Sequence, residues 1–455
     1  MGGVRRAFVL SDLHLGPGGP LTTFHEAERL AALLDHWRAR EPALELVLAG
    51  DIFDFLQVPG YDGFSATQAP ARFAQIAESP GTARVLGALR QLAARPGVEL
   101  TVLAGNHDPE LLVDGVRDAF AQTIGRAPGT IRWADDEPLV PRDGEHPPVW
   151  GRALAAPGAG DDPAKAAWVV HGDRWDPANF IDRDLLRAAA AAGTADGFAL
   201  PVGSHLVFEV LSQLKRKHRW VDELKPELGA VLPLLLAVMP LETMRYLGKH
   251  RGIAASLIVS QIRARYELGP LFTAEASVTQ LSPKPDELDA VIGALADALR
   301  TEPDAARLLA ALEAHLENGP PLESSGVLAG PRGVFGFLVR TWLRVVQKSD
   351  RFGRLDGDDA TISASERYVP EVLGALIAGH THGARVRADL RPPYFNSGTW
   401  VPVRTVPAGD LTAWLDEVTD EAAPRPPSPG TFVRVELRDG PPLVAVEEWP
   451  AKAPP

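Results

Sequence analysis

The 455-residue chain contains no cysteine. This absence excludes disulfide bonds and thiolate zinc sites, so a bound metal ion would need histidine, carboxylate, amide or backbone ligands. Basic residues are outnumbered by acidic ones, which gives a formal net charge of −13, and the sequence has no long basic stripe of the kind that nucleic-acid-binding proteins carry. A phosphate-containing substrate is still allowed, because bound cations reverse the local field of an acidic protein.

Long apolar runs are missing as well. The run near the N-terminus covers only residues 7–10, which is far too short for the core of a signal peptide, and a cytoplasmic protein is therefore expected. Residues 231–239 are strongly apolar but too few to span a bilayer. They are typical of a buried core helix. An apolar lid that receives acyl chains or makes peripheral membrane contact is the alternative, supported weakly by the basic cluster at residues 215–219.

The spacing of apolar residues predicts an α/β domain interrupted by a helical insertion. Residues 1–180 alternate buried strands with helices and form the first part of the domain. Residues 181–364 have a mostly helical pattern and form the insertion, or cap. Residues 365–455 return to strand patterns and end in a β-hairpin. The strands expected on these grounds are residues 7–10, 44–49, 98–104, 167–170, 372–378, 432–437 and 443–446.

Five of the expected strands are followed by a short polar motif. Each motif alone is weak, because an Asp after a strand is often a helix cap and a lone buried His is usually a core residue. Together they predict a metal site, because ligands bind at the carboxyl ends of strands in α/β sheets. The motifs are Asp12-Leu13-His14, Gly50-Asp51-Ile52-Phe53-Asp54, Gly105-Asn106-His107-Asp108, His171-Gly172-Asp173 and Gly379-His380-Thr381-His382.

The side chains in these motifs indicate a particular chemistry. Carboxylate, imidazole and amide ligands suit Mn²⁺, Fe²⁺ or Zn²⁺. One carboxylate can bridge two such ions roughly 3.5–4 Å apart, and the pair can activate a bridging hydroxide for in-line attack on phosphorus. The motifs therefore favour hydrolysis of a phosphoester.

With these motifs the sequence resembles the calcineurin-like metallophosphoesterases over roughly residues 5–180 and 365–405. The resemblance implies a four-layer α/β/β/α sandwich and two divalent metal ions, with Mn²⁺ expected first and Fe²⁺ or Zn²⁺ as alternatives. Within that superfamily the strings at residues 11–15, 50–55 and 396–400 are most similar to the branch that includes UDP-2,3-diacylglucosamine pyrophosphatase. Members of that branch carry Arg where this chain has His107, and their cap is shorter.

The resemblance also implies a role for individual residues. The ligands of one metal ion would be Asp12, His14, Asp51 and His382. The ligands of the second ion would be Asp51 as the bridge, Asn106, His171 and His380. His107 would act on the phosphate and protonate the leaving group.

Four further polar residues in or beside the motifs have two interpretations each. The carboxylates either orient the ligand and catalytic histidines or are ordinary turn and cap residues. The arginine either contacts substrate phosphate or is solvated. These residues are Asp54, Asp108, Asp173 and Arg174. Residues 396–400 either border the site or form a turn that enters a strand.

Three functional hypotheses remain at this stage. In the first, the substrate is a phosphodiester or pyrophosphate of a small molecule, lipid precursor or nucleotide sugar, and the insertion is a specificity lid. In the second, the protein is a phosphatase that acts on a protein or a nucleotide. In the third, it is a non-catalytic module that binds a partner through the insertion. The complete ligand set and His107 argue against the third hypothesis.

Overall fold

The computed structural model describes residues 5–136, 138–139, 149–176, 179–216, 218–225, 361–362, 369–405 and 422–451, together with residues 414, 417, 418 and 420. The described residues fall into two units. The larger unit lies within residues 1–216, 355–403 and 425–455, and the smaller within residues 217–354 and 404–424. Among the described residues, no helix is both long enough and apolar enough to cross a membrane.

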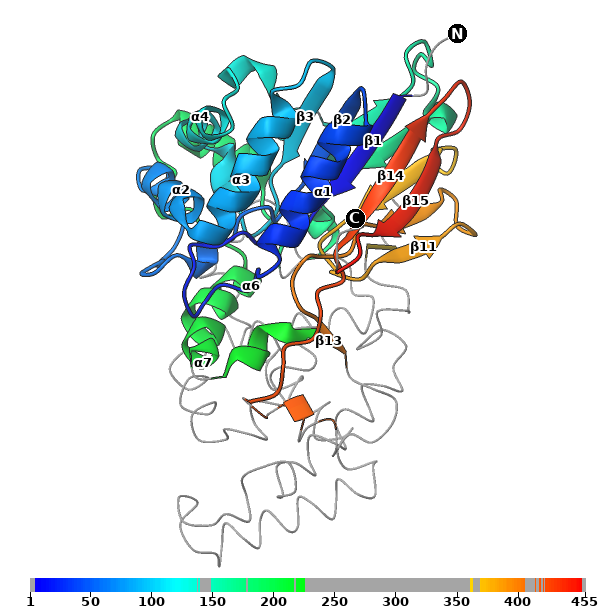
Figure 1. Ribbon diagram of the computed structural model, residues 1–455. Helices are drawn as coiled ribbons and strands as arrows, with labels where there is room; N and C mark the ends of the chain where they lie inside the picture. The colour runs from blue at the N-terminus through cyan, green and yellow to red at the C-terminus, as the bar shows by residue number, and fades with distance from the viewer. Residues whose placement is uncertain are drawn as a thin grey trace, which may run out of the picture. The chain divides into compact units, whose positions relative to one another are not determined.

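The first sheet of the larger unit has the strand order β15-β14-β1-β2-β3-β4 (Figure 1). The parallel part runs from β1 to β4, and β14 pairs antiparallel with both β1 and β15. The bounds are β1 (Arg5–Leu10), β2 (Leu44–Ala49), β3 (Val98–Leu103), β4 (Arg132–Trp133), β14 (Thr431–Leu437) and β15 (Leu443–Glu448). Because β1, β2 and β3 are parallel, the loops that follow them leave the same edge of the sheet.

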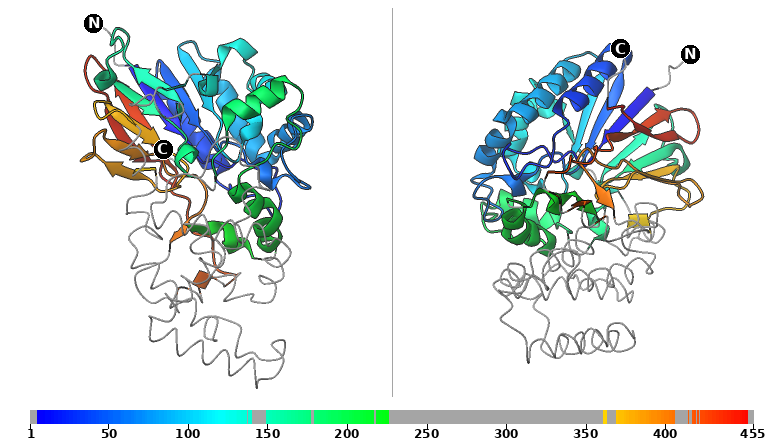
Figure 2. Two further views of the ribbon diagram at one scale, coloured as in Figure 1. Left: turned by 180° about the vertical axis from the view of Figure 1, so that it is seen from behind. Right: turned by 60° about the horizontal axis from the view of Figure 1, so that its bottom comes forward.

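Helices cover one face of this sheet (Figures 1 and 2). They are α1 (Ala27–Arg40), α2 (Ala69–Glu78), α3 (Pro80–Ala93) and α4 (Asp114–Thr123). Large apolar side chains of the strands, such as Leu46 and Leu100, pack there against helix residues such as Leu33, Leu89 and Phe120. Every residue of β2 is buried, which explains why its sequence is apolar apart from Glu45.

Further along the chain, the helices of the larger unit are α5 (Arg183–Ala191), α6 (Val202–His205) and α7 (Ser212–Lys215), with a π-helical turn at Leu206–Leu211 between the last two. Asp182 caps α5 by accepting a hydrogen bond from the backbone N–H of Leu185 over 3.0 Å.

A second sheet, with the order β11-β12-β10-β8-β7, packs on the other face of the first (Figure 2). Its strands are β7 (Arg152–Ala155), β8 (Ala166–Val169), β10 (Ala375–Ala378), β11 (Arg385–Arg387) and β12 (Tyr394–Asn396). Between the sheets, small and branched side chains such as Val9 and Val47 meet Val169 and Ile377. The outward side chains of β10 join a further buried cluster that includes helical Ile362.

These layers confirm the expected α/β sandwich. All seven expected strands are present within a few residues, although β10 begins at Ala375 rather than at residue 372. Helices α2 and α4 and the short strands β4, β7, β11 and β12 were not predicted from the sequence. A separate two-stranded pairing, β5 (Pro138–Leu139) with β6 (Val149–Trp150), was not anticipated either.

The smaller unit is described only in part. Its parallel strands β9 (Leu224–Lys225) and β13 (Arg404–Thr405) pair, and Arg404 donates from Nε to a carboxylate oxygen of Glu223 over 2.8 Å. Most of the predicted insertion at 181–364 lies outside the described residues, including the apolar stretch at 231–239. The insertion, its boundaries and its role as a lid therefore stay predictions.

Candidate metal centre

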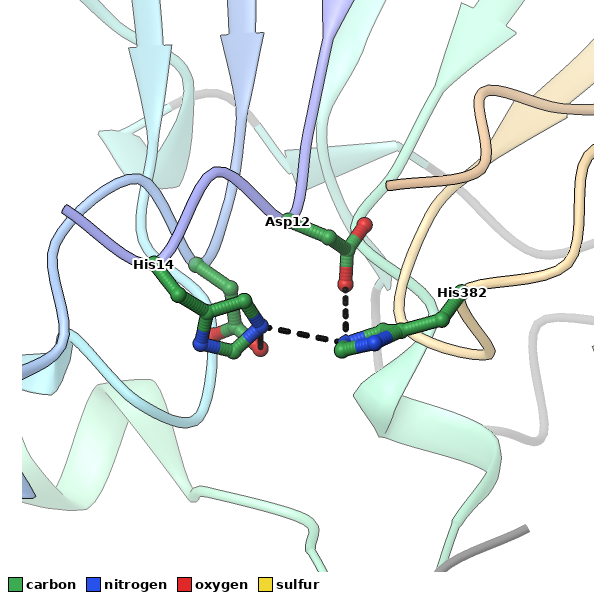
Figure 3. A group of neighbouring side chains, drawn as sticks. Asp12, His14 and His382 are labelled. Atoms are coloured by element: carbon green, nitrogen blue, oxygen red, sulfur yellow. Dashed lines mark hydrogen bonds and ion pairs between the residues drawn. The ribbon is translucent and has the colours of Figure 1, made fainter. Parts of the chain in front are cut away.

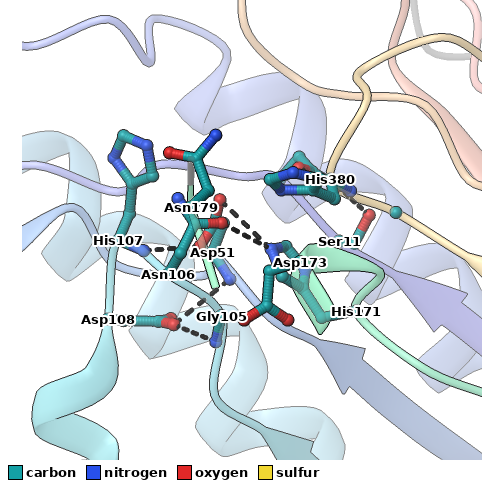
Figure 4. Close-up of polar contacts among 12 residues, drawn as sticks. Ser11, Asp51, Gly105, Asn106, His107, Asp108, His171, Asp173, Asn179 and His380 are labelled. Atoms are coloured by element: carbon teal, nitrogen blue, oxygen red, sulfur yellow. Dashed lines mark hydrogen bonds and ion pairs between the residues drawn. The ribbon is translucent and has the colours of Figure 1, made fainter. Parts of the chain in front are cut away.

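The five polar motifs of the sequence come together at one edge of the two sheets. Asp12 lies two residues after β1 and Asp51 two residues after β2, while Asn106 follows β3. His171 follows β8, and His380 follows β10. Close-ups of the two parts of the cluster show side chains from all these loops turned toward one another (Figures 3 and 4). Residues some 370 positions apart in the chain are thus neighbours.

The backbone at the cluster is held in an unusual conformation. The described residues include five non-glycine residues with positive φ, at 49° to 67°, and all of them are expected metal ligands. Left-handed backbone at a non-glycine residue typically costs on the order of 1 kcal/mol or more and persists where the surroundings enforce it. The fold thus fixes the directions of these side chains. The five residues are Asp12, His14, Asp51, His380 and His382.

One group of donors comprises Asp12, His14, Asp51 and His382, whose ligand atoms all lie within 4.8 Å of one another. Nε2 of His14 is 3.0 Å from Nε2 of His382, which in turn is 3.3 Å from Oδ1 of Asp12 (Figure 3). Two imidazole nitrogens that face each other between two carboxylates match the ligand chemistry of a divalent transition metal ion.

A second group comprises Asp51, His171 and His380, again with ligand atoms within 4.8 Å. Nε2 of His171 lies 3.4 Å from Oδ2 of Asp51 and 3.2 Å from Oδ1 of Asn106 (Figure 4). Nδ1 of His171 is 3.0 Å from the carbonyl oxygen of Ala49 and donates to it, which makes Nε2 the nitrogen that faces the cluster. Asp51 belongs to both groups.

The electrostatics of the cluster favour bound cations. Asp12, Asp51 and His171 are all buried. Burial alone would lower the pKa of His171, but the Asp51 carboxylate raises it to about 10. Burial alone would raise the pKa of Asp51, but His171 and His107 outweigh it and hold the value well below normal. The carboxylates thus favour the protonated, positively charged ring of His171. Bound divalent ions would compensate the negative charge of the carboxylates in the same way. The residues present therefore fit a metal centre.

Asp54 touches two histidines of the cluster. Its Oδ2 lies 3.1 Å from Nδ1 of His14 and 3.3 Å from Nδ1 of His107, and it accepts a hydrogen bond from Gln57 over 2.6 Å. Burial alone would raise the pKa of Asp54, but His107 and His14 hold it far below its usual value. Of the two interpretations offered for this residue, the contacts favour the one in which it orients histidines.

Asp108 contacts backbone rather than histidine. It accepts hydrogen bonds from the backbone N–H groups of Asp51, Ile52, Phe53 and Gly105, at 2.6 to 3.2 Å. Burial and the neighbouring Asp51 carboxylate raise its pKa to about 7. The contacts favour the turn interpretation: this side chain joins the loop after β2 to the loop after β3.

The other two ambiguous residues lie on η6, a short 3₁₀ helix at Asp173–Trp175. Asp173 is buried and accepts two hydrogen bonds from Arg183, each of 3.0 Å. The Arg174 guanidinium stacks over the ring of Phe180 at 4.4 Å, and it is neither fully buried nor fully exposed. A role of Arg174 in substrate binding stays a prediction.

His107 differs in exposure from the buried candidate ligands. Its side chain is 13% exposed, whereas that of His14 is 5% exposed. Its backbone N–H donates to Oδ1 of Asp51 over 2.8 Å, and its ring meets that of His14 edge-on, with centroids 4.7 Å apart. The expected acid is therefore held beside the candidate metal ligands and is more exposed than His14.

The segment at residues 396–400 borders the cluster. Oγ1 of Thr399 donates to the carbonyl oxygen of Asp12 over 2.8 Å, and Nδ2 of Asn396 donates to the carbonyl oxygen of Gly379 over 2.8 Å. The Ser11 hydroxyl contacts the Asp12 carboxylate and lies 2.6 Å from Oγ of Ser397. These contacts support the border interpretation over a simple turn.

Three residues at the site were not predicted from the sequence. Asp176 lies 3.0 Å from Nε2 of His380 through its Oδ2, which also accepts from Asn179 over 2.8 Å. Asp135 and Arg183 form a buried ion pair beside Asp173. Asp176 follows the His171 motif closely and could have been weighed with it. Nothing in the sequence links Asp135 to Arg183.

Comparison with known proteins agrees with the geometry. Residues 5–198 match the family model of the calcineurin-like phosphoesterases. No curated protein matches the chain. The family suggests metal-dependent hydrolysis of phosphoesters, and the buried Asp and His groups are able to hold metal. His380 and His382 lie beyond the matched segment, yet the structure brings them to the residues within it.

Proposed function

We propose that this protein hydrolyses a phosphoester bond with two divalent metal ions held at the candidate centre. The observation that carries the proposal is the position of Asp51, whose buried carboxylate belongs to both groups of donors. A shared carboxylate is the feature that two-metal phosphoesterases use to hold their ions a few ångströms apart.

The proposed ligands follow the two groups of donors. Asp12, His14, Asp51 and His382 would hold one ion, and Asp51, Asn106, His171 and His380 the other. Bound there, the ions would supply Lewis acidity that activates water and polarises the phosphoryl oxygens. Carboxylate, imidazole and amide donors suit Mn²⁺, Fe²⁺ and Zn²⁺. Mn²⁺ is proposed first, with Fe²⁺ and Zn²⁺ as alternatives.

The proposed acid is His107. Asp54 lies at Nδ1 of this ring, which assigns the transferable proton to Nε2. The carboxylate stabilises the protonated imidazole and fixes its orientation, and the proton passes from Nε2 to the leaving oxygen as the ester bond breaks. Asp54 also lies at Nδ1 of His14, so one carboxylate orients both a ligand and the acid.

The substrate class is proposed from the sequence. A phosphodiester or pyrophosphate of a small molecule or lipid precursor is the first choice, because the motifs are similar to the branch that includes UDP-2,3-diacylglucosamine pyrophosphatase. His107 replaces the Arg of that branch, which argues against an identical substrate. Cytoplasmic location and peripheral membrane contact through the insertion stay predictions.

The first test is hydrolysis by metal-stripped protein after addition of Mn²⁺, Zn²⁺, Fe²⁺ or Mg²⁺. The substrates are bis-p-nitrophenyl phosphate, a diester, and p-nitrophenyl phosphate, a monoester. Asp51→Asn should lower the metal-dependent turnover on the order of a hundredfold or more, because it removes the shared ligand. Asp196→Asn is the matched control, since Asp196 is an exposed carboxylate that accepts hydrogen bonds from Ser65 and Thr67.

The outcomes separate the hypotheses. The two-metal hydrolase is supported if turnover depends on added metal, is lost in Asp51→Asn and is kept in the control Asp196→Asn. A preference for the diester favours the first substrate class, and a preference for the monoester favours a phosphatase of proteins or nucleotides. Tight binding of two ions without turnover of either ester would direct attention to the partner-binding module.

A further inference from the structure

Arg183 is a buried arginine beside the metal centre. It is the first residue of α5, and its side chain is 7% exposed. Nη1 and Nη2 donate to the two carboxylate oxygens of Asp173, each over 3.0 Å, and Nε donates to Oδ1 of Asp135 over 3.0 Å. A two-pronged bond of this kind fixes orientation as well as distance.

The same guanidinium holds the backbone at the end of β3. Nη2 of Arg183 donates to the carbonyl oxygen of Ala104 over 2.7 Å. The backbone N–H of Ala104 donates in turn to Oδ2 of Asp135 over 2.8 Å. Both polar groups of Ala104 are therefore held by this one ion pair, and Ala104 stands two residues before Asn106. Arg183 and Asp135 thus hold the start of the loop that carries Asn106.

The other arm of the guanidinium reaches the loop that follows β8. Asp173 lies two residues after His171, and Figure 4 shows its carboxylate beside that ring. Gly172 between them has φ of 118°, a backbone angle that other residues rarely adopt. Asn106 and His171 contact each other over 3.2 Å. Arg183 is thus bonded to both loops whose side chains meet in the second group of donors.

The charges make the guanidinium hard to replace. Burial alone would lower the pKa of Arg183, but Asp173 and Asp135 outweigh it and raise the value. Arg183 lowers the pKa of Asp173 against the effect of burial. Without the cation, two buried carboxylates would face each other beside Asn106 and His171, and the loops would have to move to reach water.

We infer that Arg183 is a positioning residue for the second metal ion: it sets the distance between Asn106 and His171 and thereby the affinity of the site that they share with Asp51. This inference rests on the proposed function. The first group of donors comes from the loops after β1, β2 and β10, none of which Arg183 contacts in any hydrogen bond or ion pair found among the described residues. Its loss should therefore weaken one ion and spare the other.

The test measures metal binding by the full chain. Metal-stripped protein is titrated with Mn²⁺ in a calorimeter, and a low-temperature EPR spectrum reports whether two Mn²⁺ ions lie close enough to couple. Wild-type protein is expected to bind two ions. Arg183→Lys keeps the charge but loses the fork, and it should weaken one ion about 10- to 100-fold while the other binds as in wild type. The coupled signal should disappear at the Mn²⁺ concentration that saturates wild type.

Arg152→Lys is the matched control. Arg152 makes the same kind of fork to buried Glu45, with Nε and Nη2 at 2.7 and 3.2 Å from its two oxygens. Glu45 lies near the start of β2, whereas Asp51 follows the end of that strand. The control loses a comparable fork away from the site and should bind both ions as wild type does.

Hydrolysis supplies a second readout. If Arg183 acts only through position, excess Mn²⁺ should restore turnover in Arg183→Lys. Should this variant fail to fold, as judged by circular dichroism, Asp135→Asn carries the same test, because it weakens the hold on Ala104 and keeps the shape of the side chain.

Three results would overturn the inference. Binding of both ions with wild-type affinity by a folded Arg183→Lys or Asp135→Asn would leave the proposed function intact and remove the role of Arg183. Equal weakening of both ions would point to general loosening of the fold. A wild-type protein that binds fewer than two ions would instead overturn the proposed function itself, and the inference with it.

Discussion

Glu110 should make the stability of this protein depend on pH in the direction opposite to most carboxylates. It lies on η2, a 3₁₀ turn at Pro109–Leu112, and is fully buried. One oxygen accepts a hydrogen bond from the Tyr61 hydroxyl over 3.0 Å, and the other has no hydrogen-bond partner among the described residues. Burial raises the pKa of Glu110 to about 8. The folded protein therefore keeps this carboxyl group protonated at neutral pH.

The sign and size of the effect follow from this pKa. The ordinary value is 4.5 and the folded value about 8. A raised folded pKa contributes stability that is fully present below pH 4.5 and is lost as the pH rises through 8. Each unit of difference corresponds to about 1.4 kcal/mol, so the loss between pH 5 and pH 8 amounts to roughly 4 kcal/mol. Glu110→Gln keeps the oxygen that Tyr61 contacts and cannot ionise, so it should avoid this loss.

The assay is thermal unfolding of metal-stripped wild type and Glu110→Gln at pH 5 and pH 8. The two should melt at similar temperatures at pH 5. At pH 8 the variant should melt on the order of 10 °C higher, because each kcal/mol shifts the midpoint by about 2–4 °C in domains of roughly 150–250 residues. A difference that is the same at both pH values would refute the argument, since it would mean that Glu110 ionises in the folded state as it does in the unfolded chain.

Glu45→Gln is the matched control with the opposite sign. Glu45 is also buried, but Arg152 and Thr101 outweigh burial and lower its pKa. A lowered folded pKa contributes stability that is present above 4.5 and lost as the pH falls through the folded value. Glu45→Gln should therefore melt below wild type at neutral pH, and its deficit should shrink on acidification. Buried glutamates with different partners would then respond to pH in opposite directions.

Three further predictions concern the site and its support. Asp54→Asn should lower both kcat and Mn²⁺ affinity about 10- to 100-fold, because Asp54 orients the proposed ligand His14 and the proposed acid His107. Steady-state kinetics and calorimetric titration measure the two values. Wild-type values for both would contradict the orienting role of Asp54. Gly50→Ala should weaken Mn²⁺ binding in a calorimetric titration, because a Cβ at this position would overlap the ring of His171. Gly60→Ala is the control: its φ of +79° is similar, but nothing lies within 4 Å of the added atom. The control should therefore lose about 1 kcal/mol or more of stability through backbone strain and bind Mn²⁺ as wild type does. Arg29→Met should destabilise the fold by about 3 kcal/mol or more, because Arg29 is buried and donates to three backbone carbonyls of the C-terminal segment. The folded variant should bind as many Mn²⁺ ions as wild type does. A different number of bound ions would contradict a purely structural role.

The fold was largely predictable because its strands are short, apolar and buried. Residues 44–49 are apolar apart from Glu45, and the structure buries every one of them. Helix α4 (Asp114–Thr123) escaped prediction because its buried residues are few: Val116, Phe120 and Ala121. Strand β4 (Arg132–Trp133) is only two residues long, so no alternation could reveal it.

The sequence by itself determined which kinds of donor side chain the site contains. Absence of cysteine left oxygen and nitrogen donors, and each motif stood directly after an apolar strand, so the motifs were expected to meet at one edge, and they do. That these residues bind metal stays a prediction. These signals are local, because a strand and the polar loop that follows it are adjacent in the chain.

Only the tertiary structure decided how each polar residue is used. Asp54 faces two histidines, whereas Asp108, in an equally plausible motif position, binds four backbone N–H groups. Arg183 bonds to Asp135, which lies 48 residues earlier in the chain, and no spacing rule could pair them. The physical reason is that a hydrogen bond depends on distance and direction in space, and these are set by the packing of two sheets whose strands are hundreds of residues apart in the sequence.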